Sequence, residues 1–178
     1  APEEILSYLN QRSGLLDGVV ISGGEPLLQE ELIPFIRQIK ELGYAVKLDT
    51  NGTNNEKLGV LLEEGLVDFV SLDMKNSAEK YPLTSGLKSD VEYKHPISES
   101  VRLLQEYKVE HEFKTTVVKE FHTVDDLIKI AKFIGSDAHY VLQQFISSDT
   151  VIQPDLHAYT AKEMEEIKKA VEPYVKVV

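Results

Sequence analysis

Residues 18–26 have the sequence Gly18-Val19-Val20-Ile21-Ser22-Gly23-Gly24-Glu25-Pro26, in which a short apolar run stops at two glycines, a carboxylate and a proline. A run this short is typical of a strand rather than a helix, and it predicts a buried parallel strand that is covered on both faces. Gly23 and Gly24 allow backbone angles and a close ligand approach that a side chain would block. The charge of Glu25 favours an ammonium group or a metal ion over a phosphate as the ligand. A strand-to-helix turn with a solvated Glu25 is the alternative.

Helical and strand patterns alternate along the rest of the chain. This alternation predicts an α/β protein with parallel strands, although periodicity alone does not choose between a barrel and an open, doubly wound sheet. Residues 76–96 lack apolar periodicity, and we expect a long, mobile loop there. The helices are expected near residues 2–13, 29–42, 55–64, 97–107, 123–134 and 160–171, and the strands near residues 18–22, 44–49, 67–74, 109–118 and 138–146.

Length and composition limit the functions that this chain can have. The 178 residues contain no linker or repeat, so we expect a single domain over residues 1–178. The net charge of −11 and the absence of a Lys/Arg stripe argue against nucleic acid or an anionic membrane as a partner. No signal peptide and no apolar run of about 18 residues is present, so we expect a cytoplasmic protein. The chain has no cysteine, which excludes disulfides and thiolate metal sites.

Polar side chains follow the predicted strands at the points where the strands end. The carboxyl ends of parallel strands meet at one edge of a sheet, so these side chains are expected to share a ligand site. The carboxylates of Asp49 and Asp73 would repel each other unless a cation or Lys75 lay nearby, and a purely structural Asp–Lys pair is the alternative. The set comprises Glu25, Asp49, Thr50, Asn51, Asp73, Lys75, Thr115, Thr116, Gln143 and Gln144.

Other catalytic patterns are absent from the sequence. There is no Ser-His-Asp signature, no Walker A motif and no G-x-G-x-x-G motif, so hydrolase and kinase functions have no support. The histidines show no metal-ligand spacing, and most are expected at the surface. They are His95, His111, His122, His139 and His157.

Five segments in order resemble the radical S-adenosylmethionine (SAM) superfamily, and specifically its glycyl-radical-enzyme activases. The chain is most similar to the activating proteins of anaerobic ribonucleoside-triphosphate reductase, and pyruvate formate-lyase activase is a more distant relative. The resemblance extends over nearly the whole chain and implies a partial (β/α)6 barrel that is open on one side and lacks its first strand. The segments are Ser22–Pro26, Leu48–Gly52, Leu72–Lys75, Glu112–Val118 and Leu142–Phe145.

The resemblance also implies roles for individual residues. The loop of Ser22, Gly23, Gly24 and Glu25 would hold the ammonium group of SAM, and Lys75 would meet the SAM carboxylate. The remaining cofactor-binding residues would be Asn51, Asp73 and Gln144, and a monovalent cation would be held by Asp49, Thr50 and Asp73.

One departure from the family is severe. The Cys-x3-Cys-x2-Cys loop that supplies three thiolates to a [4Fe–4S] cluster has no counterpart. The chain starts at Ala1, and Pro2-Glu3-Glu4 is typical of a first helical turn whose cap lies upstream. We therefore expect a fragment that lacks the first strand and the cluster loop, rather than a naturally cluster-free relative, and we expect this chain to be inactive.

The intact protein, by resemblance, would reduce SAM at the cluster, cleave it to methionine and a 5′-deoxyadenosyl radical, and generate a glycyl radical on a partner enzyme. An electron donor such as flavodoxin is implied as a second partner. One alternative is a barrel lyase or aldolase that uses Lys75 as a Schiff base. Another is a degenerate, non-catalytic SAM-fold module that only docks a partner.

Overall fold

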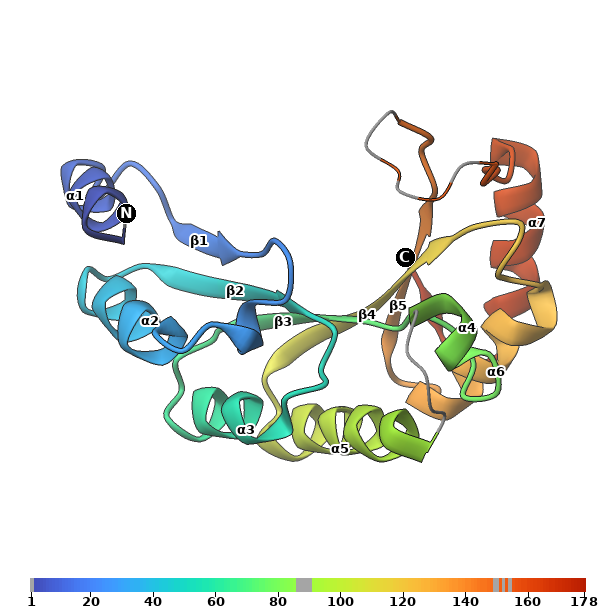
Figure 1. Cartoon of the computed structure of the whole chain (residues 1–178), viewed down its shortest axis with the longest axis horizontal. Helices are drawn as coiled ribbons and strands as arrows, with labels where there is room; N and C mark the ends of the chain where they lie inside the picture. The colour runs from blue at the N-terminus through green and yellow to red at the C-terminus, as the bar shows by residue number, and fades with distance from the viewer. Residues whose placement is uncertain (1, 86–90, 149–150, 152, 154) are drawn as a thin grey trace. The chain divides into compact units, whose positions relative to one another are not determined.

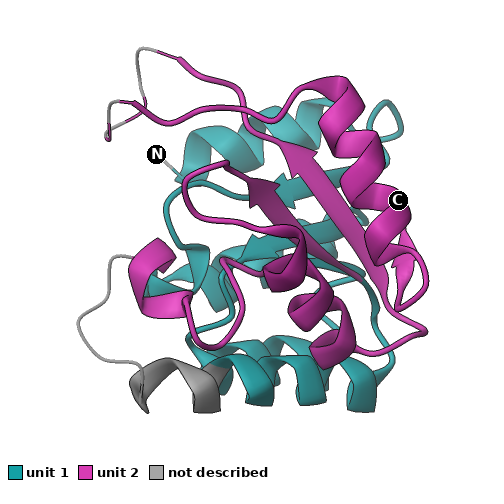
Figure 2. Ribbon diagram, turned by 90° about the vertical axis from the view of Figure 1, so that its right-hand side faces the viewer, with its two compact units in different colours: residues 1–72, 96–111 teal, residues 73–95, 112–178 magenta. Residues whose placement is uncertain are grey.

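The computed structural model describes residues 2–85, 91–148, 151, 153 and 155–178. Its contacts divide the chain into two compact units, shown in different colours in Figure 2. Unit 1 comprises residues 1–72 and 96–111, and unit 2 comprises residues 73–95 and 112–178. Parallel strands alternate with helices in both units, so the predicted α/β class is confirmed. A single domain over residues 1–178 stays a prediction.

Unit 1 contains three parallel strands in chain order (Figure 1). Asp49 of the second strand is in register with Ser71 of the third. The last residue of the third strand, Asp73, is the first residue of unit 2. The elements are α1 (Pro2–Gln11), β1 (Gly18–Ile21), η1 (Pro26–Leu28), α2 (Leu32–Glu41), β2 (Ala45–Thr50), α3 (Asn55–Glu63), β3 (Phe69–Asp73) and most of α5 (Val91–Tyr107).

The core of unit 1 lies on one face of its strands. Along β2, the side chains of Val46, Leu48 and Thr50 are buried, whereas those of Lys47 and Asp49 are partly exposed. This alternation follows from the two-residue period of a strand. On α2 and α3, the buried side chains are apolar and three or four positions apart, so they form one stripe on each helix. They are Leu32, Ile36, Ile39, Leu58, Leu61 and Leu62.

Strand β1 is where it was predicted, but the prediction that both of its faces are buried is wrong. Val20 is 59% exposed, and Val19 and Ile21 are only partly buried. Among the described residues, β1 pairs only with β2 and therefore lies at an edge. An apolar run identifies a strand but does not show whether a second neighbour covers it.

Tyr44 joins the start of β2 to α1. It is 3% exposed, and its hydroxyl donates to the Leu9 carbonyl at 2.6 Å. We expect Tyr44→Phe to lower the free energy of unfolding by about 1 kcal/mol, because it removes one buried hydrogen bond without leaving a large cavity. Urea denaturation measures this difference. Tyr8→Phe is the control: Tyr8 is 51% exposed, so a change within about 0.5 kcal/mol is expected, and equal effects would contradict the prediction.

Unit 2 also contains three strands in chain order, with Thr115 paired to Leu142 and Tyr140 to Val177. The two helices that follow β4 and β5 are capped by Thr123 and Thr160, which form capping boxes. No helix in the described ranges is long and apolar enough to cross a membrane. The elements are α4 (Tyr81–Ser85), β4 (Glu110–Val117, whose first two residues belong to unit 1), α6 (Val124–Ile134), β5 (His139–Gln144), α7 (Ala161–Val171) and β6 (Lys176–Val177).

The segment 76–96 is less irregular than its sequence suggests. It contains the short helix α4, and α5 begins at Val91, upstream of Pro96 rather than after it. The ends of α4 are held by polar contacts of Asn76 and Lys80, which produce no apolar periodicity. Residues 86–90 of the expected loop lie outside the described residues, and its mobility stays a prediction.

Candidate functional site

The loop after β1 is open to a ligand in unit 1. Ser22, Gly23 and Gly24 are exposed. Gly23 and Gly24 have φ angles of 95° and 54°, in the left-handed region that favours glycine. No heavy atom lies within 4 Å of a Cβ built on either glycine. A ligand can therefore approach this backbone closely.

Glu25 ties this loop to the end of β2. Its Oε1 accepts hydrogen bonds from Thr50 Oγ1 at 2.6 Å and from Leu27 N at 3.1 Å. Its Oε2 accepts one from Asn51 N at 2.7 Å. The structure thus brings together the predicted residues Glu25, Thr50 and Asn51. A carboxylate has about four acceptor positions, so Glu25 retains limited capacity for an incoming ammonium group.

The predicted cation ligands Asp49 and Thr50 point to opposite faces of β2. Thr50 is buried, with its hydroxyl engaged by Glu25 and by Gly52 N at 3.1 Å. Asp49 lies on the other face, with Oδ1 3.9 Å from Lys47 Nζ. The two side chains therefore lie on different faces of the strand, and the cation site stays a prediction.

Ser71 is a polar residue of this face that sequence reasoning missed. It is in register with Asp49 and is fully buried. Within the described part of the chain, its hydroxyl has no hydrogen-bond partner. A serine inside a strand belongs to no recognisable motif, so only the strand register could have pointed to it.

Asn51 has a local role in the turn after β2. Its Oδ1 accepts from Thr53 N at 3.0 Å and from Thr53 Oγ1 at 2.8 Å. This pattern is an Asx turn. The side-chain oxygen of Asn51 is therefore engaged in holding the backbone.

In unit 2, Asp73 and Lys75 form an ion pair at the end of β3. The Lys75 side chain is 40% exposed and that of Asp73 is 26% exposed. The structural Asp–Lys pair considered from the sequence is thus formed. Its exposure leaves the Lys75 ammonium accessible to a further anionic group.

Buried side chains hold the backbone beneath this ion pair. Thr115 Oγ1 donates to the Met74 carbonyl at 2.7 Å and accepts from Tyr140 at 2.8 Å. Burial raises the pKa of Tyr140, so its hydroxyl remains a donor. His122 Nε2 contacts the next carbonyl, that of Lys75, at 2.8 Å.

His122 is an exception to the expectation that most histidines lie at the surface. It is 2% exposed, whereas His139 and His157 are exposed and His111 is partly buried. The side chain of His95 lies outside the described residues. Burial lowers the pKa of His122 and outweighs the hydrogen bond to the Lys75 carbonyl, which acts in the opposite direction. The burial of His122 could not be predicted from the spacing of histidines in the sequence.

Gln144 lies at the end of β5 and is exposed, and its Nε2 donates to the Tyr159 carbonyl at 2.6 Å. The neighbouring Gln143 Oε1 lies 3.5 Å from Thr116 Oγ1. Both glutamines therefore lie at the strand ends of unit 2, as predicted.

The residues present do not fit an iron–sulfur cluster. Such clusters are held by thiolates, and the chain has no cysteine. In the described ranges, no group of three or more His, Cys, Asp or Glu side chains is placed to hold a metal ion.

Comparisons with known proteins place this fold and these motifs in a family. The model of the radical SAM superfamily matches residues 1–134. A candidate glycyl-radical enzyme activating enzyme of Methanocaldococcus jannaschii is 34% identical over 89% of this chain, which spans 68% of that protein.

Solved structures agree with this match at the level of the fold. A domain of pyruvate-formate lyase-activating enzyme from Bacteroides vulgatus has a TM-score of 0.68 and 13% identity, over 92% of this chain and 99% of that domain. A radical SAM methyltransferase from Sphaerobacter thermophilus has a TM-score of 0.76 and 10% identity, over 99% of this chain and 56% of that one. The predicted partial barrel is confirmed.

Proposed function

Because this chain belongs to the radical SAM superfamily, we propose that it is the SAM-binding core of a glycyl-radical-enzyme activating protein. The observation that carries the proposal is the Gly23–Gly24 loop, which is open to a ligand and tied by Glu25 to the end of β2. The 34% identity to a candidate activating enzyme supports the choice of reaction class. A glycyl radical enzyme would be the protein substrate, and a donor such as flavodoxin would supply electrons.

The proposed roles follow the chemistry of the ligand. Ser22, Gly23, Gly24 and Glu25 receive the ammonium group of SAM, and Lys75 binds its carboxylate. Asp73 holds the Lys75 side chain through the ion pair. The remaining proposed contacts are Asn51 and Gln144 at the cofactor, and Asp49, Thr50 and Asp73 at a monovalent cation.

The reductive step lies outside what these residues can do. A [4Fe–4S] cluster supplies the electron that cleaves SAM in this family, and its thiolate ligands are not among these residues. What this chain contributes is binding and orientation of the SAM amino-acid group.

The Schiff-base alternative has less support. A lysine that forms a Schiff base is typically desolvated in an apolar pocket or placed beside another cation. Lys75 instead pairs with Asp73 and is 40% exposed. Borohydride trapping with small carbonyl compounds tests this alternative, and an adduct on Lys75 would favour it over SAM binding.

We expect the chain to bind SAM weakly, with a Kd of roughly 0.1 to several millimolar, because a few charge-assisted contacts act without a chelating metal. Lys75→Met is expected to raise this Kd about fivefold, since it removes the proposed partner of the carboxylate. NMR titration of the labelled chain measures both values.

Lys162→Met is the matched control, because Lys162 is exposed at the start of α7. Glu25→Gln tests the loop separately: a single amide oxygen cannot accept all three hydrogen bonds that Glu25 receives. If the chain does not bind SAM at ten millimolar or so, or if Lys162→Met weakens binding as much as Lys75→Met, the proposed function is wrong.

A further inference from the structure

The backbone of Met74 and Lys75, at the start of unit 2, is held at consecutive positions by other residues of the same unit. Met74 N donates to the Lys114 carbonyl at 2.8 Å, and the Met74 carbonyl accepts from Thr115 Oγ1. The Lys75 carbonyl accepts from His122 Nε2 at 2.8 Å. His122 is therefore the side chain, among the contacts of the described residues, that reaches the backbone of Lys75 itself.

The tautomer of His122 follows from its two partners. The backbone N–H of Val118 donates to Nδ1 at 3.1 Å, so Nδ1 carries no proton. Nε2 must then carry the proton that it donates to the Lys75 carbonyl. Both ring nitrogens are engaged by backbone groups, and the ring is 2% exposed. His122 is thus a neutral link between the backbone of Lys75 and that of Val118 rather than an acid or base.

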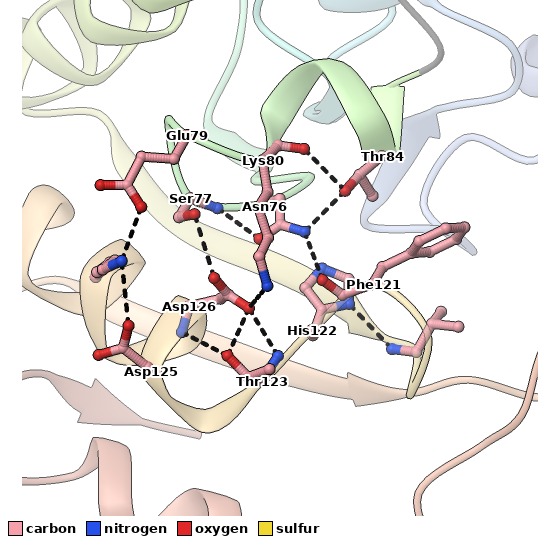
Figure 3. A network of polar contacts seen from close by, with 12 residues as sticks. Asn76, Ser77, Glu79, Lys80, Thr84, Phe121, His122, Thr123, Asp125 and Asp126 are labelled. Atoms are coloured by element: carbon pink, nitrogen blue, oxygen red, sulfur yellow. Dashed lines mark hydrogen bonds and ion pairs between the residues drawn. The ribbon is translucent and has the colours of Figure 1, made fainter.

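The surroundings of His122 keep this bridge in place. Asn76 Nδ2 donates to Thr84 Oγ1 at 2.8 Å and to the Phe121 carbonyl at 2.9 Å, next to the imidazole in Figure 3. The Tyr159 hydroxyl donates to the His122 carbonyl at 2.6 Å. Two charged groups act on the pKa of the ring in opposite directions, Lys80 and Asp126, and they pair with each other at 2.6 Å.

We propose that His122 is a positioning residue: its neutral imidazole holds the Lys75 carbonyl and thereby fixes the direction in which the Lys75 ammonium meets the carboxylate of the ligand. This inference rests on the proposed role of Lys75 in binding SAM. It adds that recognition of the carboxylate depends on a buried ring that does not touch the ligand.

Two substitutions separate the two hydrogen bonds of the ring. The amide nitrogen of glutamine can replace Nε2, so His122→Gln retains a donor to the Lys75 carbonyl. The amide oxygen of asparagine can replace Nδ1, so His122→Asn retains the acceptor for Val118 N but loses the donor to Lys75. Each variant loses one buried hydrogen bond, which makes them a matched pair for stability.

The test compares the Kd of SAM with that of decarboxylated SAM, which keeps the ammonium and sulfonium groups, by NMR titration of the full chain. We expect the wild type to prefer SAM about fivefold, and Lys75→Met to lose that preference. His122→Asn should reduce the ratio toward one, and His122→Gln should retain most of it. A merely structural role would weaken the binding of both ligands equally and leave the ratio unchanged.

Two outcomes distinguish the failure of this inference from the failure of the proposed function. No preference for SAM in the wild type would show that Lys75 does not bind the carboxylate. Both the proposed role of Lys75 and the inference about His122 would then be wrong. A preference that is lost in Lys75→Met but kept in His122→Asn would overturn the inference alone.

A second measurement applies if His122→Asn does not fold. In the wild type, the ring nitrogen resonances of His122 should show the Nε2-protonated neutral form, and SAM should shift them more than decarboxylated SAM does. Equal shifts with both ligands would overturn the inference.

Discussion

Gly52→Ala is expected to lower the free energy of unfolding by about 2–4 kcal/mol. Gly52 has a φ of 68°, which costs a residue with a Cβ about 1 kcal/mol or more. A Cβ at this position would lie 2.4 Å from Leu72 Cδ1 and 3.0 Å from Ser100 Oγ. Both neighbours are fully buried, and Ser100 Oγ also donates to the Gly52 carbonyl at 2.6 Å. The clash therefore cannot be relieved by moving one side chain into solvent.

Gly59→Ala is the matched control for this prediction. Gly59 lies inside α3, and no heavy atom lies within 4 Å of a Cβ built on it. Alanine is preferred in a helix, so this variant should gain about 0.5–1 kcal/mol. Urea denaturation of both variants measures the two changes. If both variants changed the free energy of unfolding in the same direction, the predicted strain and clash at Gly52 would be wrong.

Asp126→Ala is expected to lower the free energy of unfolding by about 2–4 kcal/mol, because it removes several charge-assisted hydrogen bonds from a buried carboxylate. The Asp126 side chain is 3% exposed. Figure 3 shows its carboxylate between Lys80 and Thr123. The Oδ2 atom accepts from Lys80 Nζ at 2.6 Å, from Thr123 Oγ1 at 2.6 Å and from Thr123 N at 2.8 Å. The loss affects both the start of α6 and the segment before α4.

The effect of Asp126→Ala should depend on pH. Burial raises the pKa of Asp126, but the hydrogen bonds from Lys80 and Thr123 outweigh it and hold the pKa below its ordinary value. A carboxylate whose pKa is lower in the folded state stabilises the fold above its unfolded pKa of about 3.9 and loses this contribution as the pH falls through the folded pKa. The difference between wild type and variant should therefore be constant between about pH 5 and 7 and narrow below about pH 4.

Asp125→Ala is the control for Asp126. Asp125 is the preceding residue, its side chain is 73% exposed, and it pairs with Lys129 at 3.1 Å. An exposed pair of this kind contributes little, so a change within about 0.5 kcal/mol is expected. Chemical denaturation across this pH range measures all three proteins. If the free energy of unfolding differed between wild type and Asp126→Ala by the same amount at every pH, the ionised carboxylate would not be the stabilising form.

Much of the local structure could be predicted from residue patterns. The helices expected near residues 55–64, 123–134 and 160–171 are present as α3, α6 and α7. These features depend on neighbours within about one helical turn, which the sequence displays directly. The motif order likewise predicted the family and the partial barrel.

The positions of polar side chains across strands could not be predicted in this way. The hydrogen bond between Thr50 and Glu25 joins residues 25 positions apart, and the one between His122 and Lys75 joins residues 47 positions apart. A single buried histidine has no periodic signature, and the exposure of β1 depends on how many strands flank it.

The sequence was therefore sufficient for the alternation of helices and strands, the placement of polar residues at strand ends, and the absence of thiolate ligands, because each of these is a property of local composition or spacing. The tertiary structure alone showed that Glu25 accepts hydrogen bonds from Thr50 and Asn51. It also placed Asp49 and Thr50 on opposite faces of β2, and it buried His122 against the Lys75 carbonyl. The physical reason is that a polar side chain has several possible partners, and its choice among them depends on which distant groups are buried beside it.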